Sequence, residues 1–426
     1  MELKPGYKQT EVGVIPEEWE LTPFVSLGSV IDGDRGSNYP GSKDFNIDGH
    51  CLFLNAGNVT KGGFRFGDCA FISREKDERL SKGKLKRDDI VLTTRGTVGN
   101  FAHFDSSVSF EHIRINSGMV ILRNESPDLD NAFLYVLLQS HFVGKQIERL
   151  TFGSAQPQLT VKGINEFWIV APPLPEQHAI AEALSDVDGL LGGLDRLIAK
   201  KRDLKQAAMQ QLLTGQTRLP GFHGEWRKTT LGQIISRFST GLNPRKNFRL
   251  NSGGNFFYVT IKNFAVGQLF LDENCDLIDE AAFWRINERS DLRKEDVLFS
   301  SIGRVGDAYL ITETPRNWNI NESVFTLRPD KSQVVPLMLF YLLTDKTVTD
   351  ALSQGVTGST FKSIKQAQLK EIPCQLPASL EEQAAIAEVL TEMDGELAVL
   401  EQRREKTRAL KHAMMQELLT GRTRLV

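Results

Sequence analysis

The segment LNPRKN, at residues 242–247, contains the Asn-Pro pair that comes nearest to a catalytic motif in this chain. In an adenine methyltransferase such a pair is followed by a proline and an aromatic residue, whereas arginine and lysine follow here. The Pro-Asp pairs at 127–128 and 329–330 do not lead into the Glu-x-Lys continuation that a nuclease site needs. The sequence therefore predicts neither methyl transfer nor strand cleavage by this chain itself.

Other catalytic, cofactor-binding and metal-binding patterns are also missing from the sequence. There is no GxxxxGK[ST] loop, no GxGxxG turn opening a helix, no HExxH, and no visible Ser/His/Asp or Cys/His arrangement. The cysteines Cys51, Cys69, Cys275 and Cys374 form no CxxC pair and have no ligand spacing with the seven histidines. We expect four reduced thiols. The sequence predicts no catalytic residue, no metal site and no cofactor bound by this chain.

The composition is that of an ordinary globular protein. The chain has 426 residues, a formal net charge of −3, 40% hydrophobic residues and 25% charged residues, which suggests two or three soluble domains. This charge neither favours nor excludes nucleic acid, because basic side chains can gather on one face. The segment MELKPGYKQTEVG lacks the apolar stretch of a signal peptide, and the longest strongly apolar run, LMLFYLL at 337–343, is too short to cross a bilayer. We expect a cytoplasmic protein without membrane contact.

The chain is a tandem repeat, which is the strongest signal in the sequence. Residues 174–219 align without a gap on residues 380–425, with about 26 identities in 46 positions. The regions before the two copies are related more weakly: LKRDDIVLTTRGTVGN from Leu85 corresponds to LRKEDVLFSSIGRVGD from Leu292. The two halves therefore share a scaffold and differ in what the scaffold carries.

Each repeated copy is predicted to be one long helix with a coiled-coil seam. Leu204 and Leu410 are expected to continue the seam after a polar stretch, and some forty helical residues span about 60 Å. The partner of each helix is the other copy, or alternatively each helix packs on its own domain. Gly189 and Gly395 lie inside the helices, which favours a close backbone crossing or a kink there. The predicted interface residues are Ile180, Leu184, Val187, Leu191, Leu194, Ile198, Ile386, Leu390, Met393, Leu397 and Leu400.

The regions that precede the two copies are predicted to be mixed, giving an α+β chain. One buried helix is expected in each region, at 131–150 and at 336–354. The expected strands lie at 89–96, 117–124, 166–173, 296–303, 322–329 and 370–377.

The predicted organisation has four parts, two globular and two helical. A first globular domain covers residues 1–173 and a second covers residues 220–378. A central helical segment covers residues 174–219 and a C-terminal helical segment covers residues 379–426. The fold class is thus two globular domains joined by two long helices, arranged as a pseudo-two-fold repeat.

Several segments resemble the signature segments of specificity subunits of type I restriction–modification systems. They are PPLPEQHAIAEAL, LTGQTRLPGFHGEWRKTTLGQI, KRDDIVLTTRGTVG and GSAQPQLTVKGI, and the resemblance runs from GVIPEEW to the C-terminus. It implies two target-recognition domains joined by two antiparallel conserved helices, with each domain reading one half of a bipartite double-stranded DNA target. It also implies a non-catalytic chain that recruits two modification subunits, which use S-adenosylmethionine to methylate adenine, and restriction subunits, which use ATP and Mg.

The resemblance implies base contacts from loops, since Arg, Asn, Gln, Ser and Thr can reach base edges and Lys can reach phosphates. The second region differs at two of these places, where Phe361 and Ser363 correspond to Gln156 and Gln158, as different half-sites would require. The candidates are Asn55, Asn58, Lys61, Lys84, Lys86, Arg87, Arg95, Thr97, Ser154, Gln156 and Gln158 in the first region, and Arg245, Lys246, Lys262, Asn263, Ser301, Arg304, Ser359, Thr360 and Lys362 in the second.

A different class of function stays open on the residues alone. The chain would then be a non-catalytic coiled-coil scaffold whose two globular domains bind protein rather than DNA. Under the DNA hypothesis the helices set the separation of two half-sites, because two major-groove segments on one DNA face lie about 34–36 Å apart.

Overall fold

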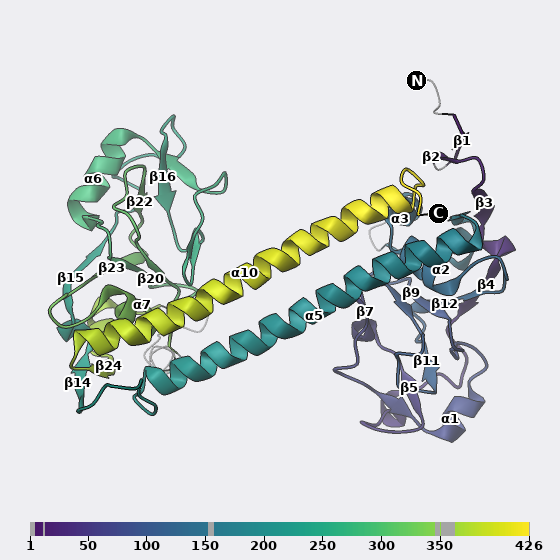
Figure 1. Ribbon diagram of the computed structural model, residues 1–426, viewed down its shortest axis with the longest axis horizontal. Coiled ribbons are helices and arrows are strands. Elements are labelled where there is room, and N and C mark those ends of the chain that lie inside the picture. The colour runs from purple at the N-terminus through teal and green to yellow at the C-terminus, as the bar shows by residue number, and fades with distance from the viewer. Residues whose placement is uncertain (1–4, 12, 152–156, 346–349, 351–362, 426) are drawn as a thin grey trace. The chain divides into compact units, whose positions relative to one another are not determined.

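The computed structural model describes residues 5–11, 13–151, 157–345, 350 and 363–425, and Figure 1 shows the course of the chain. The chain divides into two compact units: unit 1 comprises residues 1–195 and 403–426, and unit 2 comprises residues 196–402. Each unit therefore contains a globular part and a portion of both long helices. Among the helices described, none is both long enough and apolar enough to span a membrane.

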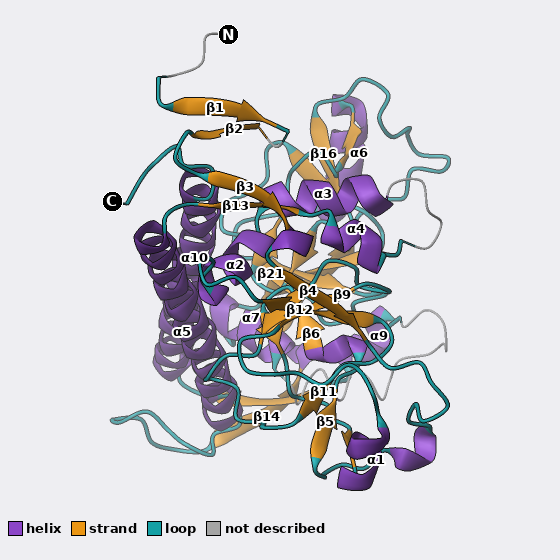
Figure 2. Ribbon diagram, turned by 90° about the vertical axis from the view of Figure 1, so that its right-hand side faces the viewer, coloured by secondary structure: helices purple, strands orange, loops and turns teal. Residues whose placement is uncertain are grey.

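The strands of unit 1 are short and mostly antiparallel. Their bounds are β1 Tyr7–Thr10, β2 Gly13–Pro16, β3 Glu20–Pro23, β4 Gly28–Asp32, β5 Cys51–Phe53, β6 Val59–Thr60, β7 Gly63–Phe64, β8 Phe71–Ile72, β9 Ile90–Thr93, β10 Phe101–His103, β11 Ile113–Arg114, β12 Met119–Asn124 and β13 Trp168–Ala171. The main sheet has the order β10-β9-β12-β4, and a second, mixed sheet has the order β11-β5-β8. Three two-stranded sheets complete the unit, and Figure 2 shows one of them, β3 beside β13.

The strands of unit 2 repeat this plan. Their bounds are β14 Trp226–Thr230, β15 Ile235–Thr240, β16 Phe256–Val259, β17 Phe264–Ala265, β18 Gln268–Leu269, β19 Asp276–Ile278, β20 Val297–Ser300, β21 Ala308–Leu310, β22 Trp318–Ile320, β23 Val324–Pro329 and β24 Pro373–Pro377. The sheet β15-β23-β20-β21 corresponds to β4-β12-β9-β10, and β19-β16-β22 corresponds to β8-β5-β11. All six strands predicted from the sequence are present, as β9, β12, β13, β20, β23 and β24. The β1-β2 hairpin has no counterpart among the described residues of unit 2.

The predicted helix over 131–150 is two helices, which corrects that expectation. Helix α2 covers Asn131–Leu138 and α3 covers His141–Thr151. Asp130 caps α2 by accepting from the Phe133 N–H at 2.8 Å, and the Ser140 hydroxyl accepts from the Val143 N–H at 3.3 Å at the start of α3. A second capping residue between two apolar runs therefore restarts the helix.

The predicted helix over 336–354 is shorter than expected where the structure describes it. Helix α7 covers Pro336–Thr344 and ends because the backbone of Asp345 is extended. Residues 346–349 and 351–354 of that prediction lie outside the described residues. The remaining short helices are α1 Arg74–Arg79, α4 Val161–Asn165, α6 Glu280–Ser290 and α9 Gln366–Lys370.

The repeated segments are two helices, α5 Leu174–Leu212 and α10 Leu380–Leu418, as predicted. In unit 2, Lys201 pairs with Glu396 at 2.5 Å and Lys205 pairs with Asp394. The α10 partner has a lower number as the α5 number rises, so the two helices run antiparallel. Unit 1 gives the same result, because Asp188 pairs with Lys411 at 2.7 Å and Asp195 pairs with Arg404 at 3.4 Å.

The same ion pair occurs in both units. An arginine that follows the end of one long helix pairs with a buried glutamate near the start of the other long helix. In unit 2, Arg218 donates from Nε to Glu382 at 2.9 Å. In unit 1, Arg424 donates from Nη2 to Glu176 at 2.7 Å, and Glu176 also accepts from the Trp19 indole at 3.1 Å. The C-terminal residues therefore complete unit 1, just as the residues after α5 complete unit 2.

The predicted coiled-coil interface residues are all buried or half-buried. Ile180 and Leu184 belong to a core of unit 1 that also contains Leu418, and Ile386 belongs to a core of unit 2 that also contains Met209. Within each unit, the helix ends therefore pack both on the globular part of that unit and on each other. Pairing with the other copy and packing on a globular domain, the two alternatives that the sequence left open, therefore both occur at the ends of the helices.

The continued seam predicted at Leu204 and Leu410 is wrong, and of the close crossing or kink predicted at the two glycines, the close crossing is wrong. Leu204 and Leu410 do not continue the seam, since they are 49% and 56% exposed. The polar stretch before them rotates the buried face, and Met209 is buried instead. A Cβ added at Gly189 or Gly395 would meet nothing within 4 Å among the described residues, so neither glycine marks a close backbone crossing.

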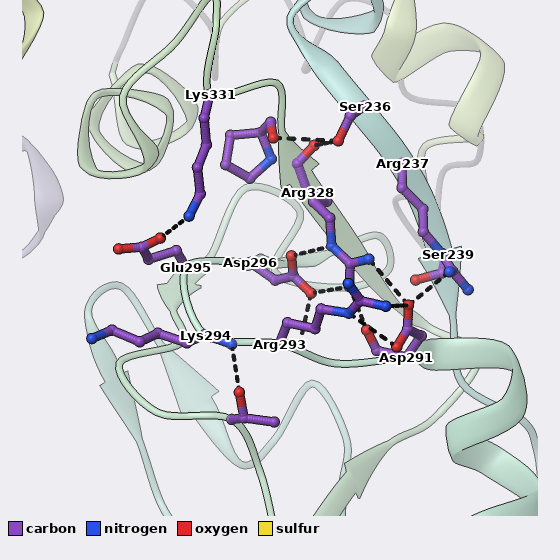
Figure 3. A network of polar contacts seen from close by, with 12 residues as sticks. Ser236, Arg237, Ser239, Asp291, Arg293, Lys294, Glu295, Asp296, Arg328 and Lys331 are labelled. Atoms are coloured by element: carbon purple, nitrogen blue, oxygen red, sulfur yellow. Dashed lines mark hydrogen bonds and ion pairs between the residues drawn. The ribbon is translucent and has the colours of Figure 1, made fainter.

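A network of arginines and aspartates supports the main sheet of unit 2 (Figure 3). Asp291, in a left-handed conformation after α6, pairs with Arg237 at 2.7 Å and Arg293 at 3.0 Å. Arg328 of β23 binds Asp296 through Nε and Nη2, both at 2.9 Å, and also reaches Asp291. Burial raises the pKa of Asp291, but Arg328 and Arg293 outweigh it and hold that pKa below its ordinary value. Since Asp296 precedes β20, the network fixes the strand that leads into the IGRVG loop.

Unit 1 contains the equivalent of the central pair. Arg123 of β12 binds the buried Asp89 through Nε at 2.8 Å and Nη2 at 2.7 Å. Asp89 precedes β9, which leads into the RGTVG loop. Bidentate pairs of this kind fix both distance and orientation. In both units, an arginine–aspartate pair therefore holds the strand that leads into the corresponding loop.

Candidate nucleic-acid interface

Three of the predicted loops meet in unit 1. The Leu159 N–H donates to the Thr94 carbonyl at 3.1 Å, which joins the segment 157–160 to the start of the RGTVG loop. The Asn100 side chain donates to the Val59 carbonyl at 3.0 Å, which joins the RGTVG loop to the β6-β7 hairpin. We call the segments 55–64, 93–100 and 157–160 the loop cluster of unit 1. Asn100 was not among the candidates, although its place directly after RGTVG was visible in the sequence.

Arg95 and Gln158 form an exposed polar pair in this loop cluster. With its oxygen oriented toward the guanidinium, the Gln158 amide accepts from Arg95 Nη2 at 2.9 Å and from Arg95 Nε at 3.1 Å. Both residues are exposed, and the Arg95 backbone is held by the Gly118 carbonyl at 3.3 Å. Among the described residues, Nη1 and one Nη2 proton have no partner, and this is the end of the fork that can bind two guanine acceptors.

The other candidates of the loop cluster divide into exposed and internal residues. Lys61 lies in the exposed turn of the β6-β7 hairpin, and Thr97 is exposed in the RGTVG loop. Asn58 is 1% exposed, and its amide donates to the carbonyls of Arg65 and Asp68. This geometry gives Asn58 a structural role in place of the base contact predicted for it. Asn55 caps the short helix before the hairpin by accepting from the Gly57 N–H at 2.7 Å, and it is half-buried.

The basic candidates at 84–87 lie outside this loop cluster and have different environments. Lys84 is paired with the buried carboxylate of Asp77, which also binds Arg114. Arg87 donates to three backbone carbonyls between residues 105 and 110 and lies 4.1 Å from the centre of the Phe104 ring. Both side chains are therefore committed to holding unit 1 together. Lys86 is exposed and is the member of the group free to contact a phosphate.

Unit 2 brings together the corresponding loops with different side chains. Arg304 donates to the carbonyls of Ile261 at 2.8 Å and Phe264 at 2.9 Å, joining the IGRVG loop to the segment before β17. Its Nε lies 3.1 Å from Oδ2 of Asp307. Burial raises the pKa of Asp307, although the Arg304 cation opposes this rise. The Arg304 side chain is 56% exposed, as Arg95 is exposed, but its guanidinium donates to backbone carbonyls whereas that of Arg95 donates to the Gln158 side chain.

Two further candidates of unit 2 are buried. Ser301 is 3% exposed and donates to the Ser323 carbonyl at 2.7 Å. Asn263 is 5% exposed and accepts from the N–H and the hydroxyl of Thr260, each at 2.9 Å. As with Asn58, these geometries assign structural roles instead of base contacts. Sequence alone could not separate these cases, because a polar residue in a glycine-rich loop has the same pattern whether it points in or out.

The remaining candidates are exposed or lie outside the described residues. Lys262, Arg245 and Lys246 are exposed on unit 2. At the position of Arg95 unit 2 has Ile302, which forms a β-bridge with Ser363, the counterpart of Gln158. The candidates that lie outside the described residues are Ser154, Gln156, Ser359, Thr360 and Lys362.

The described residues contain no group of His, Cys, Asp or Glu able to hold a metal ion. The features present are two related loop clusters, each fixed by backbone joints and a buried arginine–aspartate pair, on a scaffold of paired helices. This arrangement defines a class of tandem recognition proteins in which one chain presents two non-identical surfaces. Comparison with known proteins gives the family.

Two copies of the model for the type I restriction modification DNA specificity domain match the chain, at residues 16–198 and 223–407. A predicted type I restriction enzyme specificity subunit, MjaX of Methanocaldococcus jannaschii, is 25% identical over 436 aligned residues that cover 99% of this chain and 97% of that one. The EcoBI specificity subunit of Escherichia coli is 22% identical and aligns over 57% of this chain and 50% of its own. The crystal structure of the S subunit from M. genitalium has a TM-score of 0.59 at 18% identity and covers 98% of both chains. The chain belongs to the family of type I restriction–modification specificity subunits and carries two target-recognition domains.

Proposed function

We propose that this specificity subunit reads a bipartite double-stranded DNA target, with one half-site bound by each unit. The observation that carries the proposal is the pair of loop clusters described above. They share backbone joints and a buried arginine–aspartate pair but present different side chains, with Arg95 and Gln158 in unit 1 at the positions of Ile302 and Ser363 in unit 2. A shared frame with different surfaces is what two unlike half-sites require.

The exposed side chains suit groove contacts of two kinds. Arg95, held by Gln158, has the free donors for a bidentate contact with guanine, while an isoleucine at the same position of unit 2 suits apolar contact, such as with a thymine methyl group. The exposed cations Lys61, Lys86 and Lys262 suit phosphates, which fix position without reading sequence. The two half-sites therefore differ in base composition under these positions.

The paired helices α5 and α10 act as the spacer between the half-sites in this proposal. Their continuous α-helical course supports it, because 39 helical residues in each give a stiff element. Insertion of four residues into one helix after Leu204 should lengthen or abolish the tolerated spacer in the methylated motif. An unchanged spacer would contradict the role of these helices.

The chain itself acts in this proposal as a non-catalytic, cytoplasmic subunit. Two modification subunits bound to it supply adenine methylation with S-adenosylmethionine, and restriction subunits supply the reactions that need ATP and Mg. The surfaces of the helices outside the seam, which carry exposed side chains over most of their length, support docking of these partners.

Binding of the full-length chain, alone and with modification subunits, to duplex DNA at several salt concentrations tests the proposal. We expect the logarithm of the binding constant to fall steeply and linearly with the logarithm of salt concentration. Binding that does not depend on salt, together with capture of protein by the two units, would support a scaffold instead. Methyl transfer by the purified chain alone would show that the chain is an enzyme.

A further inference from the structure

A large groove with basic residues lies within unit 1 beside the loop cluster, and Lys61 is the one predicted contact that lines it. It has a volume of about 1330 Å³ and is formed by α3, the C-terminal part of α10, the β1-β2 hairpin and the ends of two loops of the loop cluster. Gly99 and Asn100 of the RGTVG loop and Lys61 of the β6-β7 hairpin form one side of it. The groove is therefore continuous with the surface proposed to read DNA.

The charged residues that line the groove are all basic. No aspartate or glutamate lines it among the described residues. Phe101, Leu138 and Leu419 are at most 3% exposed, but a ligand would also meet apolar side chains, because Val14 is 44% exposed and Phe142, Ile147 and Met415 are half-buried. The exposed basic residues of the lining are Lys61, His141, Lys145, Arg408, His412 and Arg422.

Part of this charge is not neutralised inside the protein. Lys411 pairs with Asp188 at 2.7 Å and Arg408 pairs with Glu405 at 2.8 Å. Arg422 is 3.7 Å from Glu417 and its side chain is 68% exposed. Lys61 and Lys145 have no ion pair in the part of the chain that the structure describes. The groove thus has cationic side chains available to a ligand of opposite charge.

The corresponding positions of unit 2 keep only part of this character, because Arg202 and Lys205 at the positions of Arg408 and Lys411 are paired with Glu401 and Asp394. The repeat places Gln206 at the position of His412 and Gln216 at the position of Arg422. In the β17-β18 hairpin, Val266 occupies the turn position of Lys61. Next to the IGRVG loop, Asp307 takes the place of Asn100. Among the described residues of unit 2, the corresponding surface is therefore less basic than the groove of unit 1.

We propose that this groove binds the sugar–phosphate backbone of the DNA that flanks the half-site read by unit 1. Three facts favour a nucleic-acid backbone: the continuity with the loop cluster, the cationic lining without carboxylates, and a volume larger than one small anion fills. The inference rests on the proposed function, because it requires unit 1 to lie on DNA. It adds a contact that anchors one side of the target through phosphates and makes unit 1 the more salt-sensitive half of the protein.

The test compares two double variants that each remove one lysine and one arginine. The groove variant is Lys145→Gln with Arg422→Gln. The matched control is Lys406→Gln with Arg403→Gln, whose side chains are exposed on the opposite side of α10 and have no ion pair among the described residues. All four side chains are exposed, so both variants should unfold at the temperature of the wild type.

The binding of a fluorescent mixed-sequence duplex is measured at several salt concentrations, with the full-length chain assembled with modification subunits. Each lost phosphate contact lowers the magnitude of the slope of log affinity against log salt by about 1. The slope of the groove variant should therefore be smaller by about 2, and this variant should bind several-fold more weakly at low salt. The control variant should keep the wild-type slope.

The other outcomes overturn the proposal in distinguishable ways. Equal slopes for the wild type and the groove variant would show that the groove does not contact DNA. A groove variant that binds DNA normally but no longer assembles with modification subunits would assign the groove to an acidic protein segment. Failure of the wild-type complex itself to bind the duplex would instead refute the proposed function, and the inference with it.

Discussion

The ion pair between Arg424, near the C-terminus, and Glu176, at the start of α5, leads to a prediction about the stability of unit 1. The carboxylate of Glu176 is fully buried, and its partners are the Arg424 guanidinium and the Trp19 indole N–H. Arg424→Ala would leave this carboxylate without its cation. The corresponding change in unit 2 is Arg218→Ala, which removes the partner of Glu382, 1% exposed.

The magnitude follows from the burial of the pair. Removing one partner of a buried ion pair costs about 3–5 kcal/mol, because the other charge remains desolvated. Arg424 keeps 26% of its side-chain exposure, so water can partly replace it, and Trp19 still donates. We therefore expect the lower end, about 3 kcal/mol, which corresponds to an increase of about 100-fold in opening of the affected unit.

Hydrogen exchange followed by mass spectrometry measures this unit by unit. Arg424→Ala should speed exchange in β3, β13 and the first turns of α5, and leave β14 and β24 unchanged. Arg218→Ala should do the reverse, and Arg424→Lys should fall between because lysine keeps the charge and loses the fork. Equal acceleration of both units, or none, would refute the conclusion that the C-terminal residues close unit 1.

Three further predictions follow from single positions. Gly189→Ala or Gly395→Ala should each raise the free energy of unfolding by up to about 1 kcal/mol in a denaturant titration, since the new Cβ meets open space in a helix; a loss of stability would contradict the helix geometry. Arg95→Ala should weaken binding to the specific target by about 1–3 kcal/mol while changing binding to unrelated duplex much less, as measured by fluorescence anisotropy; a uniform loss would point to a phosphate contact. Burial raises the pKa of Asp77, but the cations of Lys84 and Arg114 outweigh the effect of burial and hold this pKa below its ordinary value of 3.8. The stabilisation by Asp77 is therefore present above pH 3.8 and is lost as the pH falls through the lower folded pKa, so acid titrations of the wild type and Asp77→Asn should converge below that value and not above it.

The repeat and the elements of regular structure were predictable from the sequence because their signals are local and duplicated. The strand at 89–96 is a buried run of Ile, Val and Leu between turn residues, and β9 forms there. The 46-residue repeat predicted α5 and α10 and their pairing. The break between α2 and α3 was missed because Ser140 and its neighbours interrupt an apolar pattern too briefly to register as an end.

The candidate site was predictable at the level of loops and not of side chains. The three loops of unit 1 do meet, yet Asn58 points inward and Arg95 outward, and only the fold decides this. The pairing of Arg95 with Gln158 joins residues far apart in the chain, and so does the basic groove, whose Lys145 and Arg422 are separated by most of the second half of the sequence and part of the first. Such groupings depend on tertiary packing, which residue spacing does not encode.

The central claim is that this chain selects the DNA sequence that a modification complex methylates. Long-read mapping of methylated adenines in the source genome, with the gene present, deleted and restored, tests it most directly. We expect one bipartite motif whose methylation disappears on deletion and returns on restoration. Methylation that is the same with and without the gene, or loss of a motif with a single uninterrupted block, would contradict it.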